Sequence, residues 1–248
     1  MPFLFFRFDE MTNVLITGNS SGLGLGLSRA WLARGACVYG LSRRGCPLQH
    51  ADLHDVRLDL KQHPQISPAL DQLLDGVTDL EQVVLNAGVL GNIQLLSDTA
   101  MPEIYEVMDI NVWSNKLILD WLLARKITIK QIVLISSGAA ISGNKGWGAY
   151  ALSKATLNML TRLYSHEFGD SQLIALAPGL VDTAMQDILS DPEQVNVDDF
   201  PTIQRLRDAK GTAAMPDPDQ AAEKIIERLP DIGRNVPSGS FVDLRDFG

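Results

Sequence analysis

The sequence predicts a three-layer α/β protein in which helices cover both faces of a doubly wound parallel sheet. About seven apolar, strand-like runs recur along the chain, most of them rich in Val, Ile and Leu without polar alternation, as in parallel strands buried on both faces. Helical patterns separate these runs. No proline- or glycine-rich linker divides the 248 residues. We therefore expect a single domain over residues 11–248.

The expected elements alternate in the order that such a sheet requires. Strands are expected at Asn13–Thr17, Cys37–Leu41, Val56–Leu58, Gln82–Asn86, Gln131–Ser136, Leu173–Ala177 and Gly239–Leu244. Helices are expected at about Leu23–Arg34, Gln65–Leu74, Pro102–Arg125, Ala149–Phe168 and Asp217–Glu227. The stretch 183–215 is charged and irregular and contains two prolines. A connection that long inside a compact domain is typical of a lid over a binding site.

Composition and charge exclude several classes of protein. The chain is 46% hydrophobic and 21% charged, so it can build a sizeable core. A net charge of −9 argues against nucleic-acid binding, which needs a basic face. Cys37 and Cys46 match no zinc-binding spacing, so we expect no metal and two free thiols in a reducing cytoplasm.

The first ten residues are expected to be an N-terminal extension. They are apolar, but Arg7 interrupts the run, Asp9 and Glu10 follow it, and no small-residue cleavage site is present, so a signal peptide is not expected. No apolar stretch reaches the ~18 residues that a membrane span needs. We expect no association with a membrane.

A glycine-rich segment follows the first expected strand and opens the first expected helix. A helix N-terminus at the carboxyl end of a parallel strand offers unpaired N–H groups to a pyrophosphate, and glycine lets the backbone approach it. The common GxGxxG pattern fails here, because Leu27 occupies the sixth position counted from Gly22. An ordinary glycine-rich turn is the alternative. The expected phosphate-binding residues are Gly18, Asn19, Ser20, Ser21, Gly22, Leu23 and Gly24.

The end of the second expected strand indicates the type of dinucleotide. A carboxylate there binds the ribose 2′-OH of NAD, whereas arginine accommodates the 2′-phosphate of NADP. The sequence has Ser42, Arg43 and Arg44 at this place, and residues 11–51 contain no Asp or Glu. The planar guanidinium group suits a phosphate. We expect NADP(H), with a solvated surface pair of arginines as the alternative.

Two side chains of the second half can carry acid–base chemistry. Tyr150 and Lys154 are four residues apart and share one face of a helix. A nearby ammonium favours the phenolate and lowers the tyrosine pKa, which makes tyrosine a usable general acid for a carbonyl oxygen. Ser136 and Ser137 end the preceding strand, and the Ser137 hydroxyl can hydrogen-bond a substrate oxygen. A turn serine is the alternative.

Taken together, these residues resemble the short-chain dehydrogenase/reductase family over nearly all of Asn13–Leu244. The matching motifs, in order, are Thr17-Gly18-x-x-x-Gly22-x-Gly24, Asp59, Asn86-Ala87-Gly88, Asn111, Ser137, Tyr150-x-x-x-Lys154 and Pro178-Gly179-x-Val181-x-Thr183. Each motif is weak by itself, and their joint order and spacing are specific. The resemblance implies a Rossmann fold and oxidoreductase activity.

The resemblance also assigns roles to individual residues. It implies that Tyr150 is the general acid–base, that Lys154 lowers its pKa and holds the nicotinamide ribose, and that Ser137 polarises the substrate carbonyl. It implies that Asn111 holds a water that links Lys154 to solvent. The further cofactor contacts that it implies are Asp59 and Leu60 at the adenine, Asn86, Ala87 and Gly88 along the cofactor, and Pro178, Gly179, Val181 and Thr183 at the carboxamide. The cofactor itself supplies the hydride chemistry.

The C-terminal segment "SGSFVDLRDFG" differs from the Val-Asp-Gly-Gly segment of many relatives and is more similar to the sepiapterin reductase and benzil reductase branch. In sepiapterin reductases the aspartate of this segment anchors the pterin, and Asp243 has the matching place. A surface aspartate at a strand end is the alternative. The resemblance implies a homo-oligomer, either a dimer through its two long helices or a tetramer.

The sequence therefore predicts an NADPH-dependent reductase of a small apolar or aromatic carbonyl compound. Trp147 and Met185 are expected in the substrate pocket with Ser137, Tyr150 and Asp243, because pockets are mostly apolar with a few polar anchors. The alternative is a binding or signalling protein that keeps the dinucleotide site with little or no turnover. Nucleotide-sugar epimerases usually have a longer C-terminal domain, and enoyl reductases space the tyrosine and lysine more widely.

Overall fold

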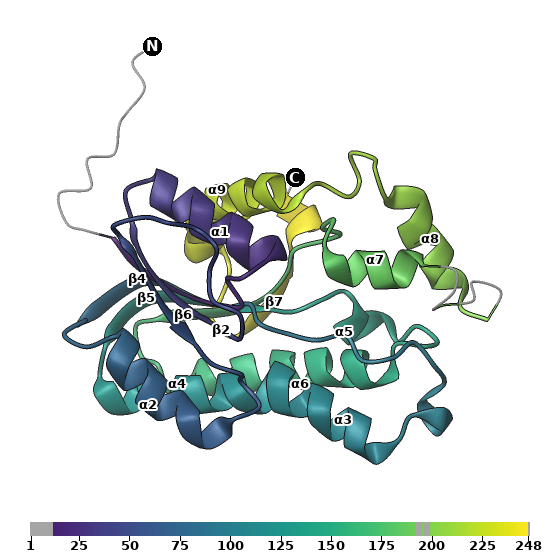
Figure 1. The fold of residues 1–248 in the computed structure, drawn as a ribbon, viewed down its shortest axis with the longest axis horizontal. Coiled ribbons are helices and arrows are strands. Elements are labelled where there is room, and N and C mark those ends of the chain that lie inside the picture. Colours follow the sequence, from purple (N-terminus) through teal and green to yellow (C-terminus); the bar gives the residue numbers. More distant parts are fainter. Residues whose placement is uncertain (1–11, 192–194, 196–198, 248) are drawn as a thin grey trace, which may run out of the picture.

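Helices lie on both faces of a parallel sheet, as the strand–helix alternation predicts. The computed structural model describes residues 12–191, 195 and 199–247. Within these residues, a seven-stranded sheet has the order β3-β2-β1-β4-β5-β6-β7, and every pair of neighbours is parallel. Figure 1 shows α1 and α9 above the sheet and α2, α4 and α6 below it. The predicted doubly wound fold is confirmed.

The described elements have the following bounds. The strands are β1 (Asn13–Thr17), β2 (Cys37–Ser42), β3 (Leu53–Arg57), β4 (Asp79–Leu85), β5 (Thr128–Ile135), β6 (Gln172–Ala177) and β7 (Ser240–Asp243). The helices are α1 (Gly22–Ala33), α2 (His63–Leu73), α3 (Met101–Met108), α4 (Ser114–Arg125), α5 (Ala139–Ser142), α6 (Gly148–Tyr164), α7 (Ala184–Ser190), α8 (Pro201–Ala209) and α9 (Pro218–Asn235). The predicted extension at residues 1–10 lies outside the described residues.

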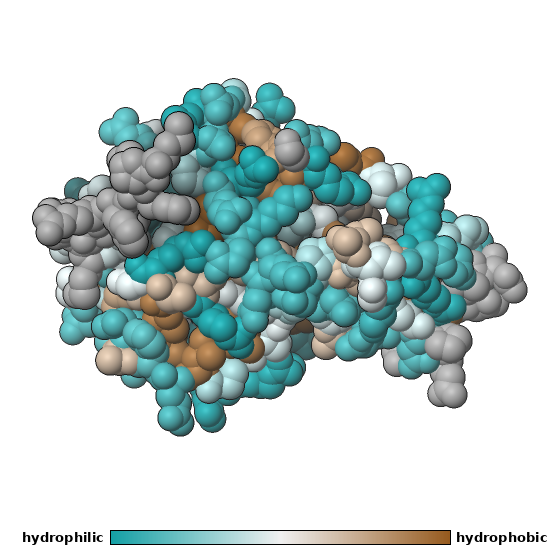
Figure 2. Space-filling model, turned by 90° about the horizontal axis from the view of Figure 1, so that it is seen from above, coloured by the Kyte–Doolittle hydropathy of each residue, from teal (hydrophilic) through white to brown (hydrophobic). Residues whose placement is uncertain are grey.

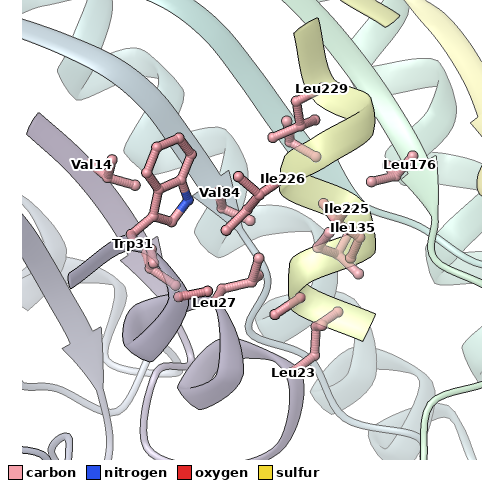
Figure 3. Packing of buried hydrophobic residues seen from close by; sticks show 14 of the residues in the cluster. Val14, Leu23, Leu27, Trp31, Val84, Ile135, Leu176, Ile225, Ile226 and Leu229 are labelled. Atoms are coloured by element: carbon pink, nitrogen blue, oxygen red, sulfur yellow. The ribbon is translucent and has the colours of Figure 1, made fainter. Parts of the chain in front are cut away.

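The hydrophobic core has one layer on each side of the sheet. In the upper layer, Leu23, Leu27 and Trp31 of α1 face Ile225, Ile226 and Leu229 of α9, and both sets lie on buried side chains of the strands (Figure 3). The lower layer joins β-strand residues to α2, α4 and α6. Because both faces are covered, the strands carry the unbroken apolar runs seen in the sequence.

The outward side of the upper layer is mainly hydrophilic, with smaller apolar areas between the polar ones (Figure 2). This is the usual consequence of amphipathic helices that turn one face to the core. Among the described helices, none combines the length and the apolar character that crossing a bilayer requires.

Helices α1 and α9 pack closely because one contact position is glycine. A Cβ at Gly26 would overlap the main-chain carbonyl of Pro218 at the start of α9. Asp217 caps α9 by accepting from the backbone N–H groups of Asp219 and Gln220 at 2.9 Å each. The helix continues to Asn235, eight residues beyond the predicted end, although Pro230 lies inside it. Buried Leu229 and Ile232 hold this last part against the sheet.

Three glutamine side chains cross the sheet in a hydrogen-bonded row. Gln82 donates to the Gln131 side-chain oxygen at 2.7 Å, and Gln131 donates to that of Gln172 at 2.6 Å. Gln172 in turn donates to the Val236 carbonyl at 2.6 Å, at the end of α9. The row matches the registers of β4, β5 and β6 and connects the sheet to α9 through hydrogen-bonded amides. At the far end of the row, the buried Gln82 side-chain oxygen has no partner within the described residues.

The segment expected to be irregular, 183–215, is partly helical, so that expectation was wrong. Helix α7 begins directly after Thr183, and α8 begins at Pro201, where proline suits the first helical turn. Leu189 of α7 and Ile203 and Leu206 of α8 are buried in a small cluster with Tyr150. Figure 1 shows both helices together at one end of the molecule.

Candidate active site

A cavity of about 420 Å³ opens at the carboxyl ends of the strands. This is where ligands bind in open parallel sheets, at the switch point between β1 and β4. Nearly all residues expected at the cofactor and substrate sites line it together: Gly18, Ser20, Ser21, Gly22, Leu23, Ser42, Arg43, Arg44, Asp59, Leu60, Asn86, Ala87, Gly88, Ser137, Trp147, Tyr150, Lys154, Pro178, Gly179, Val181, Thr183 and Met185. Asn19, Gly24, Asn111 and Asp243 are not in the lining.

The turn between β1 and α1 is a cradle that only glycine permits. Gly18 has φ +73°, and a Cβ there would lie 2.9 Å from the Ala87 Cα. A Cβ at Gly24 would overlap the Gly18 carbonyl. The Thr17 hydroxyl accepts from the backbone N–H groups of Asn86 and Ala87 at 3.0 and 3.1 Å, which fixes the two loops side by side.

The N-terminus of α1 faces this cradle without a side-chain cap. Ser21 is the N-cap residue and makes no capping hydrogen bond, so the first backbone N–H groups of the helix are not occupied by its side chain. The positive end of the helix dipole and the backbone without side chains lie at the same place, and together they fit the pyrophosphate of a dinucleotide.

The second loop adds positive charge beside the cradle. The Arg44 guanidinium donates to Ser21 Oγ at 2.6 Å and to Ser20 Oγ at 3.4 Å. Ser42 is buried, and its hydroxyl has no hydrogen-bond partner within the described residues although it lines the cavity. The polar groups that border this end therefore fit a phosphorylated ribose.

Ser137 and Tyr150 meet at the other end of the cavity. Ser137 follows β5, and its Oγ accepts from the Ala139 backbone N–H at 3.1 Å. The Ser137 hydroxyl is also hydrogen-bonded to the Tyr150 side chain. The neighbouring Ser136 hydroxyl instead donates a hydrogen bond to Asn158 Oδ1 at 2.6 Å, which connects the end of β5 to α6. The structure thus places Ser137, and not Ser136, beside the phenol.

The pKa of Tyr150 differs from the sequence-based expectation. Burial raises the pKa of its phenol above the ordinary value, and the hydrogen bond from Ser137 lowers it only in part. A pKa lowered by the Lys154 ammonium was expected, and in the structure burial outweighs any such effect. The same burial lowers the pKa of Lys154 to about 8.

Asn111 lies in a π-helical turn, Asp109–Trp113, that separates α3 from α4. The predicted single helix over Pro102–Arg125 was therefore wrong at its centre. In a π-helical turn the backbone N–H bonds the carbonyl five residues back instead of four. The Ser114 hydroxyl donates to the Ile110 carbonyl at 2.6 Å, and the Asn115 amide donates to the Asn111 carbonyl at 2.8 Å. Two buried side chains thus donate to main-chain carbonyls of this turn.

The Asn111 side chain supports the loop that follows β4. It donates to the Val89 carbonyl and to Ser153 Oγ at 2.9 Å each, and it accepts from the Val89 backbone N–H at 2.8 Å. Through Ser153 it is connected to α6, the helix that carries Tyr150 and Lys154. Its predicted role in holding a water beside Lys154 stays a prediction.

Trp147 connects the N-terminus of α6, the helix of Tyr150 and Lys154, to α8. Its indole N–H donates to Thr202 Oγ1 at 3.2 Å, and its ring lies 6.0 Å from that of Tyr150. Gly146, with φ +93°, leaves room for the Phe200 ring, which a Cβ would meet at 2.6 Å. Sequence reasoning named Trp147 and Met185 for the pocket but missed Leu180 and Leu206, which also line the cavity and have no motif to mark them.

Asp243 is paired with Arg245 and is not among the residues that line the cavity. One carboxylate oxygen accepts from the backbone N–H and Nε of Arg245 at 3.0 and 2.8 Å, and the other accepts from Nη2 at 2.6 Å. The Arg245 hydrogen bond holds the pKa of this carboxyl below its usual value. The predicted role of Asp243 as a substrate anchor stays a prediction.

Comparison with known proteins agrees with this geometry. The family model described as short chain dehydrogenase matches residues 12–194. A Bacillus subtilis protein named benzil reductase ((S)-benzoin forming) is 28% identical over 94% of this chain and 98% of its own length. A Saccharomyces cerevisiae protein with the same name is 30% identical over 70% of this chain and 73% of its own length.

Solved structures with the same fold are also found. The crystal structure of a Saccharomyces cerevisiae short-chain dehydrogenase/reductase superposes with a TM-score of 0.79 and 23% identity over 95% of this chain and 96% of its own. The matched segment, 12–194, contains the glycine cradle together with Ser137, Tyr150 and Lys154. The chain is an oxidoreductase of the short-chain dehydrogenase/reductase family.

Proposed function

We propose that this protein is an NADPH-dependent reductase that converts a small apolar or aromatic carbonyl compound to an alcohol. The observation that supports it is the meeting of Ser137, Tyr150 and Lys154 in one cavity whose other end is bordered by Arg43 and Arg44. Relatives that carry the name benzil reductase, including those from Bacillus subtilis and Saccharomyces cerevisiae, support the class of substrate.

In this proposal a bound nicotinamide dinucleotide supplies the hydride. Ser137 donates a hydrogen bond to the substrate carbonyl oxygen and orients it. The Tyr150 phenol donates its proton to the same oxygen. A raised pKa keeps this phenol protonated at neutral pH, as a general acid for reduction must be. The Lys154 ammonium, 5.6 Å from the centre of the phenol ring, stabilises the phenolate that remains.

The apolar wall of the cavity supports an uncharged substrate. Trp147, Leu180, Met185 and Leu206 line the part of the cavity near Tyr150 and present rings or methylene groups rather than charges. Burying aromatic surface against such a wall is favourable, by about 25 cal/mol per Å². Aryl ketones and diketones fit this chemistry, and helices α7 and α8 close over them as the proposed lid.

The test measures NADPH oxidation against a panel of benzil, phenylpropanedione, isatin and sepiapterin, with NADH in parallel. We expect turnover with NADPH, weaker turnover with NADH, and loss of turnover by about 10²–10⁴-fold in Tyr150→Phe. Tyr39→Phe, at a phenol on β2 that does not line the cavity, is the matched control and should keep activity. Tight NADPH binding without turnover of any panel member would favour a binding protein without chemistry.

We also propose a homo-oligomer through α3, α4 and α6. Large apolar side chains are exposed on α3, on the turn that follows it and on α6, namely Met101, Tyr105, Trp113, Met159 and Leu163. Trp121 of α4 is instead buried within the subunit. Exposed apolar area of this kind is typical of protein interfaces. Light scattering of the wild type and of Leu163→Glu tests this, and a monomeric wild type would contradict it.

We also propose that the protein acts in the cytoplasm. Cys37 and Cys46 are both free thiols, which suits a reducing compartment.

A further inference from the structure

Asp55 connects the two loops that border the dinucleotide end of the cavity. It lies on β3, opposite Gly40 of β2 in the register of the sheet. One oxygen of its carboxylate accepts from Asn19 Nδ2 at 2.8 Å. The other accepts from the backbone N–H of Cys46 at 3.0 Å. Asn19 belongs to the glycine cradle after β1, and Cys46 ends the turn that follows Arg43 and Arg44 after β2.

The path of this contact across the sheet depends on a missing side chain. Asn19 follows β1 and Asp55 is on β3, so their side chains meet over the intervening strand β2. A Cβ at Gly40 would overlap Asn19 Nδ2 and would lie 2.5 Å from Asp55 Oδ1. Glycine at position 40 therefore creates the space in which the bond forms. Asn19 is completely buried there.

The carboxylate also fits the turn that follows the arginines. Gly45 has φ +81°, a conformation that favours glycine, and a Cβ there would lie 3.2 Å from Asp55 Oδ2 and 2.7 Å from Arg57 Nε. The turn thus packs directly on Asp55. Its last N–H points at the carboxylate, which fixes the position of the loop that carries Arg43 and Arg44.

The chemistry of this contact requires a carboxylate. Both partners of Asp55 are N–H donors, and only a group with two acceptor oxygens satisfies both. An asparagine has one acceptor and would place its own NH₂ group against one of the two donors. A serine or alanine would leave both donors without Asp55.

We propose that Asp55 is a positioning residue that sets the distance between the phosphate-binding turn after β1 and the arginine loop after β2, and thereby the preference for a 2′-phosphorylated dinucleotide. The proposal rests on the proposed NADPH dependence. A dinucleotide that carries a 2′-phosphate spans both loops, so it loses affinity when their separation is not fixed. A dinucleotide without this phosphate does not bridge to the arginines of the second loop and loses less.

The test compares Asp55→Asn with the wild type by calorimetric titration with NADP⁺ and with NAD⁺, which needs no turnover. We expect the dissociation constant for NADP⁺ to rise about tenfold or more, as for loss of one charge-assisted hydrogen bond, and that for NAD⁺ to rise less than about threefold. Asp52→Asn is the matched control, because this exposed carboxylate lies just before β3 and makes the same change of charge away from both loops. The control should bind both dinucleotides as the wild type does.

Other outcomes would overturn the inference. Unchanged NADP⁺ binding would show that Asp55 is an ordinary surface residue. Equal losses for both dinucleotides together with a lowered melting temperature would show a role in the fold alone. Equal effects of Asp52→Asn and Asp55→Asn would show a general effect of charge. A wild type that binds NAD⁺ more tightly than NADP⁺ would instead overturn the proposed cofactor, and a wild type that binds neither would overturn both proposals.

Discussion

The buried ammonium of Lys154 donates a hydrogen bond to the main-chain carbonyl of Ile135 at 2.6 Å. Ile135 is the last residue of β5, two positions before Ser137, so this bond joins the strand that presents the serine to the helix that presents Tyr150. The lysine is thus a structural connection as well as a charge. Its burial carries a cost, which the first prediction measures.

Replacing Lys154 by Met should change how stability depends on pH. The folded pKa of Lys154 is about 8, against 10.5 for the ordinary side chain. Between these values the unfolded wild type binds more protons than the folded one, so its free energy of unfolding rises with pH. Between pH 7 and pH 10.5, the free energy of unfolding of the wild type should therefore rise by roughly 3 kcal/mol relative to that of Lys154→Met. Urea unfolding at several pH values measures this gain.

The control for this prediction is Lys130→Met, at an exposed lysine that pairs with Glu81. The difference in free energy of unfolding between the wild type and Lys130→Met should not rise with pH in this way. A constant difference between wild type and Lys154→Met across the same pH range would contradict the depressed pKa. Turnover should be lost in Lys154→Met at every pH.

Arg44→Ala should weaken NADPH selectively. Loss of a charge-assisted contact to the 2′-phosphate should raise the KM for NADPH about tenfold, with little effect on the KM for NADH. Arg29→Ala is the control, since Arg29 belongs to the same positive stretch of sequence but forms an exposed ion pair with Asp219. Steady-state kinetics with both cofactors decides; equal losses for NADPH and NADH would count against the assignment of Arg44.

Trp147→Phe should loosen the contact between the catalytic helix and α8. The phenyl ring keeps apolar contact with Tyr150 but loses the hydrogen bond to Thr202, and Thr202→Val loses the same bond from the other side. Each variant should raise the KM for the carbonyl substrate by a few-fold, about 1 kcal/mol. The double variant should be no worse than either single one, because both remove one interaction. Additive effects would mean that the two residues act separately.

Ser114→Ala should destabilise the protein by about 1–3 kcal/mol, because the partly buried Ile110 carbonyl in the π-helical turn loses a hydrogen bond. Thr156→Ala is a close control, since its hydroxyl makes the same contact four residues back, to Leu152, on an exposed α-helical face. That change should cost less than about 0.5 kcal/mol. Chemical unfolding of both variants tests this, and equal costs would show that the π-helical turn does not depend on Ser114.

The strands and the main site were predictable for physical reasons. Buried parallel strands leave a plain apolar signal, and residues that touch a common ligand at the strand ends recur at fixed spacings. The third strand was placed three residues late, because β3 is at the edge of the sheet and its exposed His54 and Asp55 hide the apolar signal. No sequence motif marks Asp55, because in the proposed role it acts through Asn19 and Cys46 and does not touch the ligand.

The features that were missed depend on tertiary contacts. Helices α7 and α8 are too short to leave a clear periodic pattern in the sequence. They are recognised only in the structure, where Leu189, Ile203 and Leu206 pack in one cluster with Tyr150. The raised pKa of Tyr150 comes from burial, which the spacing of Tyr150 and Lys154 does not contain. The last turns of α9 form in spite of Pro230 because Ile232 is buried.

The π-helical turn at Asp109–Trp113 has a consequence for how chain length is tolerated here. Each residue turns an α-helix by about 100°. A π-helical turn holds one extra residue, so the helix accommodates a one-residue insertion with little increase in its length. The faces of α3 and α4 are therefore out of phase with each other. A chain one residue shorter at this point would form a straight α-helix, keep α4 in its place, and present a different side chain toward Val89 and Ser153 than Asn111.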